Sequence, residues 1–505
     1  MPSSANVGLV SEGAVGVRWS GISALSRMAF ETIGAVILAR LLSPADFGLM
    51  AMVRIVIGFT QLYMDFGISG AIVHRQRSTH DELSSLYCLN ILTGLGAFAI
   101  AVLAAPTLAS LLGDPRLVAL LRAAALVFVI SPVGQQFQIL LEKHLRFERL
   151  ARAEIIGSLV GVVTGITSAL VGLGVWTLVS SSLAATCTAT ALYLRAGLPL
   201  HRPSLHYRWA EVRNYVGFGL FQLGERTVNH LAERFDQILI GPILGARALG
   251  FYSMAFNLTG RPIYSINPIL TRVAFPLFSK VQDDGERLQR GYLRLVGLLA
   301  TINAPLLVGL LVVAPVAIPV IYGSKWSESI ILVQILCLVS LIRCIGNPIG
   351  SLQLAKGRAD LGFWWNVVFF VVSIPTIYFG GKLAGAPGVA LALLSTSLLL
   401  LLPSYFLLIR PLIGRCGADY AMTIMKPTAL ASIMGVAVFS CGQVLTGIGG
   451  PVRLAIEIIL GATVYIVLNL IFRREFFQES LRILLPRWLS AFSLPRAKHE
   501  ALYDG

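Results

Sequence analysis

Six ionisable side chains lie within a short segment, Phe221–Gly241, of a chain that is otherwise strongly apolar. They are Glu225, Arg226, His230, Glu233, Arg234 and Asp236. Most of them, with two amides, recur at i, i+3, i+4 and i+7, which predicts one polar stripe on a helix. The stripe consists of Arg226, Asn229, His230, Glu233, Asp236 and Gln237. Guanidinium groups bind phosphate through paired hydrogen bonds, while carboxylates and imidazoles bind protons or cations.

The composition indicates where this stripe lies. Of the 505 residues, 56% are hydrophobic and 13% are charged, whereas a soluble protein carries about 25% charged residues. These proportions predict an integral membrane protein. A charged stripe must then face protein or water, because a charge in lipid is costly. The net charge of +15 is expected to mark cytoplasmic loops, and no nucleic-acid partner is predicted.

Several classes of chemistry have no support in the sequence. The six cysteines are scattered without a CxxC motif, so they are expected to be buried apolar residues and not a disulfide or zinc framework. We find no Walker motif, metal-ligand cluster or nucleophile–base arrangement, so we predict neither an enzyme nor a bound cofactor. The first residues lack the pattern of a cleaved signal peptide, and the first span is expected to act as its own signal.

Fourteen apolar segments are long enough to cross about 30 Å of hydrocarbon. This predicts an all-α integral membrane protein with 14 transmembrane helices. The segments are 13–40, 44–72, 83–107, 117–140, 153–172, 175–195, 212–241, 246–272, 292–320, 328–354, 360–382, 386–409, 419–444 and 452–472. Lysine and arginine gather in alternate loops, so the positive-inside rule places the N- and C-termini in the cytoplasm.

Individual joints between the spans have recognisable signals. Ser43, Pro44 and Asp46 give an N-cap, a first helical residue and an acid at the third position, which predicts a helix start. Residues 280–294 are expected to form a polar loop leading into a helix, because they are too charged to span. Residues 474–505 are expected to be a cytoplasmic tail, with an interfacial amphipathic helix at 474–492.

The two halves of the chain are weakly similar. Residues 37–52 align with residues 239–254, so that Gly48 meets Gly250. Extending the same alignment toward the N-terminus pairs Glu31 with Glu233. Because both copies run in the same direction, the repeat predicts two lobes related by a pseudo-two-fold axis along the membrane normal. The expected lobes are 1–200 and 205–415, with six helices each, followed by two further helices in 416–473 and the tail in 474–505.

Several of these segments together resemble a known family. Residues 38–75 contain LARLLSPADFGLMAM and DFGISGAIVHR, residues 235–294 contain FDQILIGPILGARALGFYSMAFNL, and residues 322–326 are YGSKW. In these motifs the chain is similar to the Wzx-type flippases and polysaccharide exporters of the multidrug/oligosaccharidyl-lipid/polysaccharide superfamily. The resemblance implies a bacterial inner-membrane protein that exports undecaprenyl-pyrophosphate-linked oligosaccharide by alternating access of two lobes. The implied partners are membrane lipids, a polysaccharide polymerase, and chain-length or export proteins.

For such an anionic substrate we expect a cationic cavity between the lobes, since arginine stays charged and binds phosphate in a bidentate manner. The expected substrate-binding residues are Arg27, Arg54, Arg226, Asn229, Arg234 and Arg261. The expected residues for charge balance, or for coupling to H⁺ or Na⁺, are Glu31, Asp65, His230, Glu233 and Asp236. Some pairs, such as Arg27 with Glu31 at i and i+4, would equally serve only to hold helices in register.

Two other functions remain open. A multidrug or cation antiporter on a related fold would have a cavity dominated by carboxylates and aromatic rings, whereas arginines are prominent here. A membrane-embedded polysaccharide polymerase component would need acidic catalytic residues in large extramembrane loops, and the outer loops are short.

Overall fold

Helices form all of the regular structure in the described part of the chain. The computed structural model describes the backbone of residues 4–64 and 79–478. It describes side chains at 18–61, 79–209, 212 and 234–478, apart from positions 262, 272 and 359. Within these ranges every regular element is a helix, which confirms the all-α prediction there. Eleven of the helices are long and apolar enough to cross a membrane, as expected of a multi-pass protein.

The chain divides into two compact units. Unit 1 comprises Met1–Leu258, Ala317–Leu336 and Phe363–Leu400, and unit 2 comprises Thr259–Val316, Cys337–Gly362 and Leu401–Gly505. The helices of the first half of the chain are α1 (Ser4–Leu41), α2 (Pro44–Met64), α4 (His80–Leu112), α5 (Leu117–Ala124), α6 (Val127–Lys143), α7 (Phe147–Leu170), α8 (Trp176–Gly197) and α9 (Trp209–Ser265).

The second half of the chain supplies the remaining helices. They are α10 (Asn267–Lys280), α11 (Gly285–Tyr322), the 3-10 turn η1 (Ser324–Trp326), α12 (Ser329–Gly346), α13 (Ile349–Ala355), α14 (Ala359–Ser404), the π-helical turn η2 (Tyr405–Ile409), α15 (Arg410–Ile413), α16 (Gly417–Val444) and α17 (Gly450–Phe472). Predicted loop 280–294 is shorter than expected, because α11 starts at Gly285, where the Asp284 carboxylate accepts a hydrogen bond from the Arg287 N–H at 3.0 Å.

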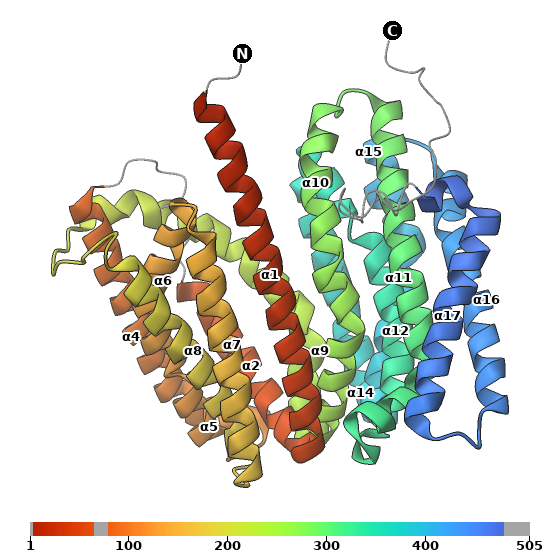
Figure 1. Ribbon diagram of the computed structural model, residues 1–505, viewed down its shortest axis with the longest axis horizontal. Coiled ribbons are helices and arrows are strands. Elements are labelled where there is room, and N and C mark those ends of the chain that lie inside the picture. Colours follow the sequence, from red (N-terminus) through yellow and green to blue (C-terminus); the bar gives the residue numbers. More distant parts are fainter. Residues whose placement is uncertain (1–3, 65–78, 479–505) are drawn as a thin grey trace. The chain divides into compact units, whose positions relative to one another are not determined.

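In unit 1, helices α4 to α8 pack side by side as one bundle (Figure 1). The pairing of α7 with α8 depends on small residues: Gly161 faces Ser181 and Ala185 so closely that an added Cβ would lie 2.8 Å from the Ala185 Cβ. The Ser181 hydroxyl also donates to the Gly161 carbonyl at 2.7 Å. Small residues allow close helix approach in membranes, where lipid offers no hydrophobic drive for association.

Helix α1 packs along α7 in the same manner. A Cβ at Gly34 would lie 2.9 Å from the Val162 side chain, so a larger residue at position 34 would push the two helices apart. This contact fixes which residues of α1 face α7. One consequence is that the polar residues one or two turns before Gly34 lie beside the start of α7.

Helices α9 and α14 each contain a break at which the chain reverses. The backbone is non-helical at Gly245 in α9 and at Ala384 and Gly385 in α14. Residues on opposite sides of each break touch: the Tyr252 hydroxyl donates to the Asp236 carboxylate at 2.6 Å, and the hydroxyls of Thr376 and Thr396 are 3.1 Å apart. Each run is therefore a helical hairpin, and both breaks lie where the sequence predicts a turn between spans.

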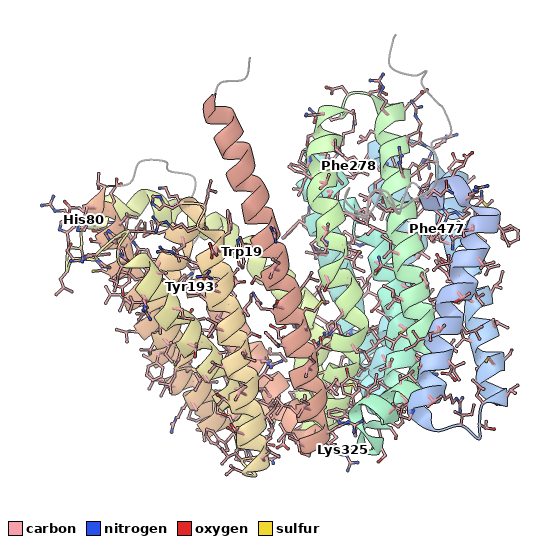
Figure 2. The ribbon with its side chains drawn as sticks, viewed as in Figure 1. Trp19, His80, Tyr193, Phe278, Lys325 and Phe477 are labelled. Atoms are coloured by element: carbon pink, nitrogen blue, oxygen red, sulfur yellow. The ribbon has the colours of Figure 1, made fainter. Side chains whose placement is uncertain are left out.

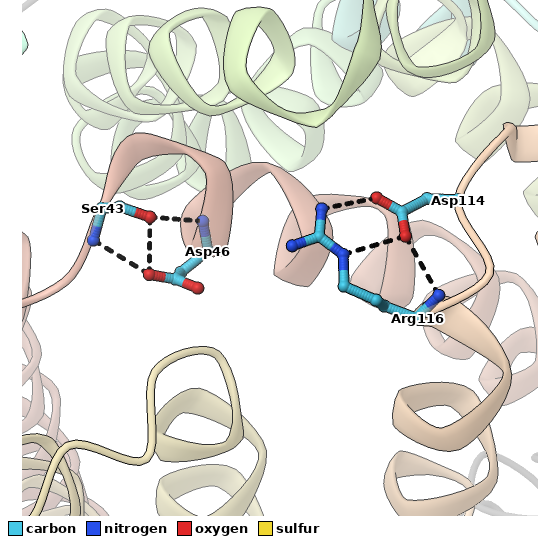
Figure 3. A network of polar contacts seen from close by, with 4 residues as sticks. All are labelled: Ser43, Asp46, Asp114 and Arg116. Carbon is cyan, nitrogen blue, oxygen red and sulfur yellow. Dashed lines mark hydrogen bonds and ion pairs between the residues drawn. The ribbon is translucent and has the colours of Figure 1, made fainter.

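The start of α2 has the cap that the sequence predicts (Figure 3). The Asp46 N–H donates to the Ser43 hydroxyl at 3.3 Å, and the Ser43 N–H donates to the Asp46 carboxylate at 2.9 Å. This reciprocal capping box satisfies two otherwise unpaired donors. The second network in Figure 3 closes the α4–α5 turn, where hydrogen bonds from Arg116 lower the pKa of the Asp114 carboxyl.

Two glycines that the repeat aligns with each other meet in unit 1. A Cβ at Gly48 would lie 1.7 Å from the Ala246 carbonyl oxygen, and a Cβ at Gly250 would lie 1.8 Å from the Pro44 carbonyl oxygen. Pro44 and Ala246 are also aligned by the repeat. The contact between α2 and the second arm of α9 is therefore reciprocal, with backbone against backbone.

Buried polar contacts hold unit 2 together. Asn303 of α11 donates to Asn267 of α10 at 3.1 Å, and Asn267 donates to the Cys344 carbonyl at 3.3 Å. Helix α17 docks on α11 through the Tyr465 hydroxyl, which donates to the Thr301 carbonyl at 2.9 Å. The predicted amphipathic tail lies outside the described residues from position 479 onward.

The reciprocal glycine contact makes a direct prediction. Replacing Gly48 or Gly250 by alanine places a methyl group on a backbone carbonyl, which cannot swing aside as a side chain can. We expect a loss of about 1–3 kcal/mol of stability, typical of overpacking, measured as a lower melting temperature of the purified protein. The matched control is Gly96→Ala on α4, where a Cβ meets nothing within 4 Å, and melting there should be unchanged or slightly higher. Equal melting temperatures for the Gly48 and Gly96 variants would contradict the packing argument.

Candidate functional site

The ionisable residues predicted from sequence fall into three groups in the structure. Asp65 lies outside the described residues. The backbone of α9 is described, but four of its predicted side chains are not: those of Arg226, Asn229, His230 and Glu233. Arg27, Glu31, Arg54, Arg234 and Asp236 lie in unit 1. Arg261 lies in unit 2, as does Arg343, and both side chains are half-buried.

Arg27 of α1 lies between two carboxylates. Its Nη2 is 3.8 Å from Oε1 of Glu31, one turn further along α1, and its Nη1 is 3.6 Å from Oε2 of Glu154 on α7. The Ser23 hydroxyl donates to the same oxygen of Glu154. The predicted i, i+4 pair of Arg27 with Glu31 is therefore present, and it is extended by a carboxylate that the sequence did not single out.

A second group of charges lies around Arg54 of α2. Both Glu31 and Arg234 act on Arg54 electrostatically, the first by attraction and the second by repulsion. The guanidinium of Arg234 also lies over the Phe256 ring, 5.7 Å from its centroid, in a cation–π contact. Unit 1 thus brings two of the predicted cationic residues, Arg27 and Arg54, near Glu31, and a third, Arg234, near Arg54. Arg54 remains exposed and Arg234 is half-buried.

Asp236 differs from these residues because it is buried. Its carboxylate accepts hydrogen bonds from the Tyr252 hydroxyl at 2.6 Å and from the Gln237 N–H at 2.8 Å, and only 4% of the residue is exposed. The Tyr252 bond connects the two arms of the α9 hairpin. The geometry favours a structural tie for Asp236.

A second polar network joins the ends of α1 and α11 (Figure 2). Lys325 donates to the carbonyls of Arg40 and Leu42 at 2.8 and 2.6 Å. In return, Arg40 donates to the Ile321 carbonyl at 2.8 Å and also to Val320. Each cation therefore caps the other helix, at the carbonyl end where the backbone acceptors are unpaired and the helix dipole is negative.

Trp326 closes this network. Its side chain is fully buried, its indole N–H donates to the Ala39 carbonyl at 2.8 Å, and its ring meets Phe47 and Phe251 edge-on, with centroids 5.2 and 5.9 Å away. Burial lowers the pKa of the neighbouring Lys325, while the carboxylate of Asp46 opposes this. We call Arg40, Lys325 and Trp326, with the carbonyls they bond, the end lock.

Two parts of these networks were missed from the sequence. Glu154 follows Arg149 and Arg152, which predict a cytoplasmic loop, but α7 starts at Phe147 and carries Glu154 about two turns into the helix. Lys325 and Trp326 belong to the YGSKW segment, which was recognised only as part of a family resemblance. Their partners are backbone carbonyls, which leave no trace in a residue pattern.

The chain is similar to proteins of cell-surface polysaccharide synthesis. Residues 37–331 match the model of the family described as "Polysaccharide biosynthesis protein". The chain is 34% identical to the lipopolysaccharide biosynthesis protein WzxC of Escherichia coli strain K12, over 86% of this chain and 88% of that protein. It is 31% identical to the teichuronic acid biosynthesis protein TuaB of Bacillus subtilis strain 168, over 90% of this chain and 94% of that protein.

Among solved structures, the fold matches the lipid II flippase MurJ in an inward closed conformation. The TM-score is 0.72 at 15% identity, over 91% of this chain and all of that chain, so the likeness is one of fold. The family match covers more than half of the sequence, and it includes the end lock and most of the helices that carry the arginines. On these grounds the chain belongs to the polysaccharide biosynthesis protein family.

Proposed function

We propose that this protein is a flippase that moves an undecaprenyl-pyrophosphate-linked oligosaccharide across the bacterial inner membrane, for the assembly of exopolysaccharide, capsule or O-antigen. The observation that carries the proposal is a group of three cations in unit 1: Arg27 lies 3.8 Å from Glu31, and Arg54 is attracted by Glu31 and repelled by Arg234. The family and the polysaccharide relatives support the substrate class. The protein makes no covalent change to the substrate in this proposal.

The depth of the two arginines fits an anionic headgroup in transit. At a rise of about 1.5 Å per residue, Arg54 is roughly 15 Å from the start of α2 at Pro44, and Arg234 is roughly 16 Å from the α9 break at Gly245. Half the hydrocarbon thickness is about 15 Å. Both guanidinium groups therefore belong near the middle of the membrane.

The charges there do not balance within the described residues. An arginine at the centre of a spanning helix costs about 2.5–3.5 kcal/mol, and Arg54 lies in the field of a second arginine, Arg234, and of one carboxylate, Glu31. A pyrophosphate would supply the missing negative charge and accept paired hydrogen bonds from each guanidinium. The unbalanced pair therefore favours an anionic substrate over the cations of a multidrug antiporter.

Transport by alternating access requires that one end of the pathway be closed at a time. The positive-inside assignment puts the end of α1 on the periplasmic side. The end lock would then hold α1 to α11 at the outer end, as the inward-facing phase of the cycle requires. A proton or sodium ion is the proposed coupling ion, since no nucleotide-binding motif is present in the sequence.

The proposed topology has 14 crossings with both termini in the cytoplasm. It adds α2, the first arm of α9 and the second arm of α14 to the eleven candidate spans. The reciprocal contact of Gly48 and Gly250 supports two repeat-related lobes, 1–200 and 205–415, followed by α16 and α17. A polysaccharide polymerase and chain-length or export proteins are the proposed partners.

Arginine replacement tests the anion site. Arg54→Ala and Arg234→Ala should each reduce polysaccharide export at least tenfold, because each removes one of the charges that offset the pyrophosphate. Export is measured in a deletion strain together with the leaflet distribution of the lipid-linked intermediate, at matched protein levels. Arg152→Gln is the control, since Arg152 is 64% exposed and pairs with Glu148 on the surface of α7. Normal export by the double variant Arg54→Ala/Arg234→Ala would refute the cationic site.

The end lock can be tested by hydrogen exchange. Lys325→Met removes the donor to two carbonyls of the α1 end, so amide exchange in residues 39–47 should rise at least severalfold. Trp326→Phe keeps a ring but loses the N–H bond to Ala39, and it should have a smaller effect. Lys382→Met is the matched control, because Lys382 contacts the Tyr378 ring instead. An unchanged exchange rate in the Lys325 variant would argue against a closing role for these contacts.

A further inference from the structure

The ion pairs of Arg27 are unusually long. Its nitrogens lie 3.6 and 3.8 Å from the nearest carboxylate oxygens, whereas Arg247–Glu328 and Arg453–Glu457 have N···O distances of 2.7 and 2.8 Å. Charge-assisted hydrogen bonds have lengths of about 2.7–2.9 Å. Arg27 is therefore attracted to both of its carboxylates without a hydrogen bond of normal length to either.

Glu154, in contrast, is held in place. Helix α7 is fixed against α1 at Gly34, and the Ser23 hydroxyl donates to the carboxylate oxygen that faces Arg27. The Glu154 side chain is 27% exposed, against 60% for Glu31. Of the two carboxylates, Glu154 is thus the more fixed and the more desolvated partner.

Among the ion pairs described above, Glu154 takes part in one, with Arg27. Glu142 on α6 and Glu154 repel each other. Glu154 also acts electrostatically on Tyr193 of α8, which is labelled in Figure 2. Arg27 acts on the same Tyr193. The side chain of Arg152 is paired with Glu148 instead. If Arg27 moved away, the Glu154 carboxylate would be left near the Glu142 carboxylate. Glu154 therefore competes with any other anion for the Arg27 guanidinium.

The position of Arg27 suits an early encounter with substrate. Arg27 lies roughly 21 Å from the outer end of α1 at Leu41, by the rise of about 1.5 Å per residue. This is nearer the cytoplasmic side than Arg54 or Arg234. The side chain is 46% exposed, so its unused N–H groups are open to a ligand.

We propose that Glu154 is the counter-ion of Arg27 in the empty carrier, and that a phosphate-bearing lipid headgroup replaces Glu154 as the partner of Arg27 when the substrate enters. This inference rests on the proposed function and adds a positioning residue to it. The exchange makes and breaks no covalent bond: Arg27 turns from the Glu154 carboxylate to the pyrophosphate, and Ser23 keeps Glu154 in place. Glu154 thereby sets how tightly the headgroup is held on the cytoplasmic side.

The test is a binding measurement on the full-length protein in nanodiscs. Glu154→Gln keeps the size and the acceptor for Ser23 but removes the competing charge. An ion pair at a partly exposed site contributes about 0.2–1 kcal/mol, so affinity for undecaprenyl pyrophosphate should increase by about 1.4- to 5-fold. A residue with a purely structural role would weaken binding when replaced. Arg27→Ala should weaken binding, and Glu154→Asp should stay close to the wild type.

Glu148→Gln is the matched control on the same helix, because Glu148 pairs with Arg152 and not with Arg27. Inorganic pyrophosphate serves as a second probe that separates headgroup recognition from lipid recognition. Its affinity should rise by the same factor in Glu154→Gln, and a rise for the lipid alone would overturn the counter-ion exchange. If the wild type binds neither probe, the proposed function fails. If the wild type binds and Glu154→Gln binds equally or more weakly, only the role of Glu154 fails.

Discussion

A charge inside a hydrocarbon layer needs a partner, and the kind of partner decides what that charge can do. Three cations of the described spanning helices illustrate three kinds of partner. Arg453 has a carboxylate at hydrogen-bond distance, Glu457, which is almost fully buried. Arg40 bonds to backbone carbonyls. Arg27 has only long contacts to carboxylates. The first two kinds stabilise a fixed arrangement, whereas the third leaves donor capacity for a ligand.

Helix packing by small residues determines which charges meet. Gly34 sets the register of α1 on α7, which brings Arg27 to Glu154, and Gly48 sets the register of α2 on the second arm of α9. In a membrane these contacts are strong because they are close, not because they exclude water. The charge clusters are thus a consequence of the glycine positions, and the two should be understood together.

The sequence predicted the local features of the fold well. Hydropathy predicted an all-α, multi-pass protein, Ser43 and Asp46 predicted the start of α2, and the turns at Gly245 and Gly385 fall between predicted spans. These features depend on residues close in the chain, so a pattern of spacing can reveal them. Loop charges are local as well, which is why they suggested a topology.

The site was predicted only in part, because its contacts join residues far apart in the chain. The i, i+4 pair of Arg27 and Glu31 could be predicted from one helix, but Glu154 comes from α7 and its pairing required the packing at Gly34. The partners of Lys325 are backbone carbonyls, which every sequence has. The repeat aligned Gly48 with Gly250, but only the folded structure shows that the two glycines touch.

Helix α1 connects the two networks, and their chemistry differs in a way that suits alternating access. At the end that the proposed topology places outside, the bonds run from cations to backbone carbonyls. Nearer the end that the proposed topology places in the cytoplasm, the carboxylates of Glu31 and Glu154 lie 3.8 and 3.6 Å from the Arg27 nitrogens, beyond normal hydrogen-bond length. In the proposed cycle, a substrate entering from the cytoplasm would therefore change the charge balance at one end of α1 while the other end stays closed. Release of the outer end then needs movement of the helices themselves, since the local charge does not change there.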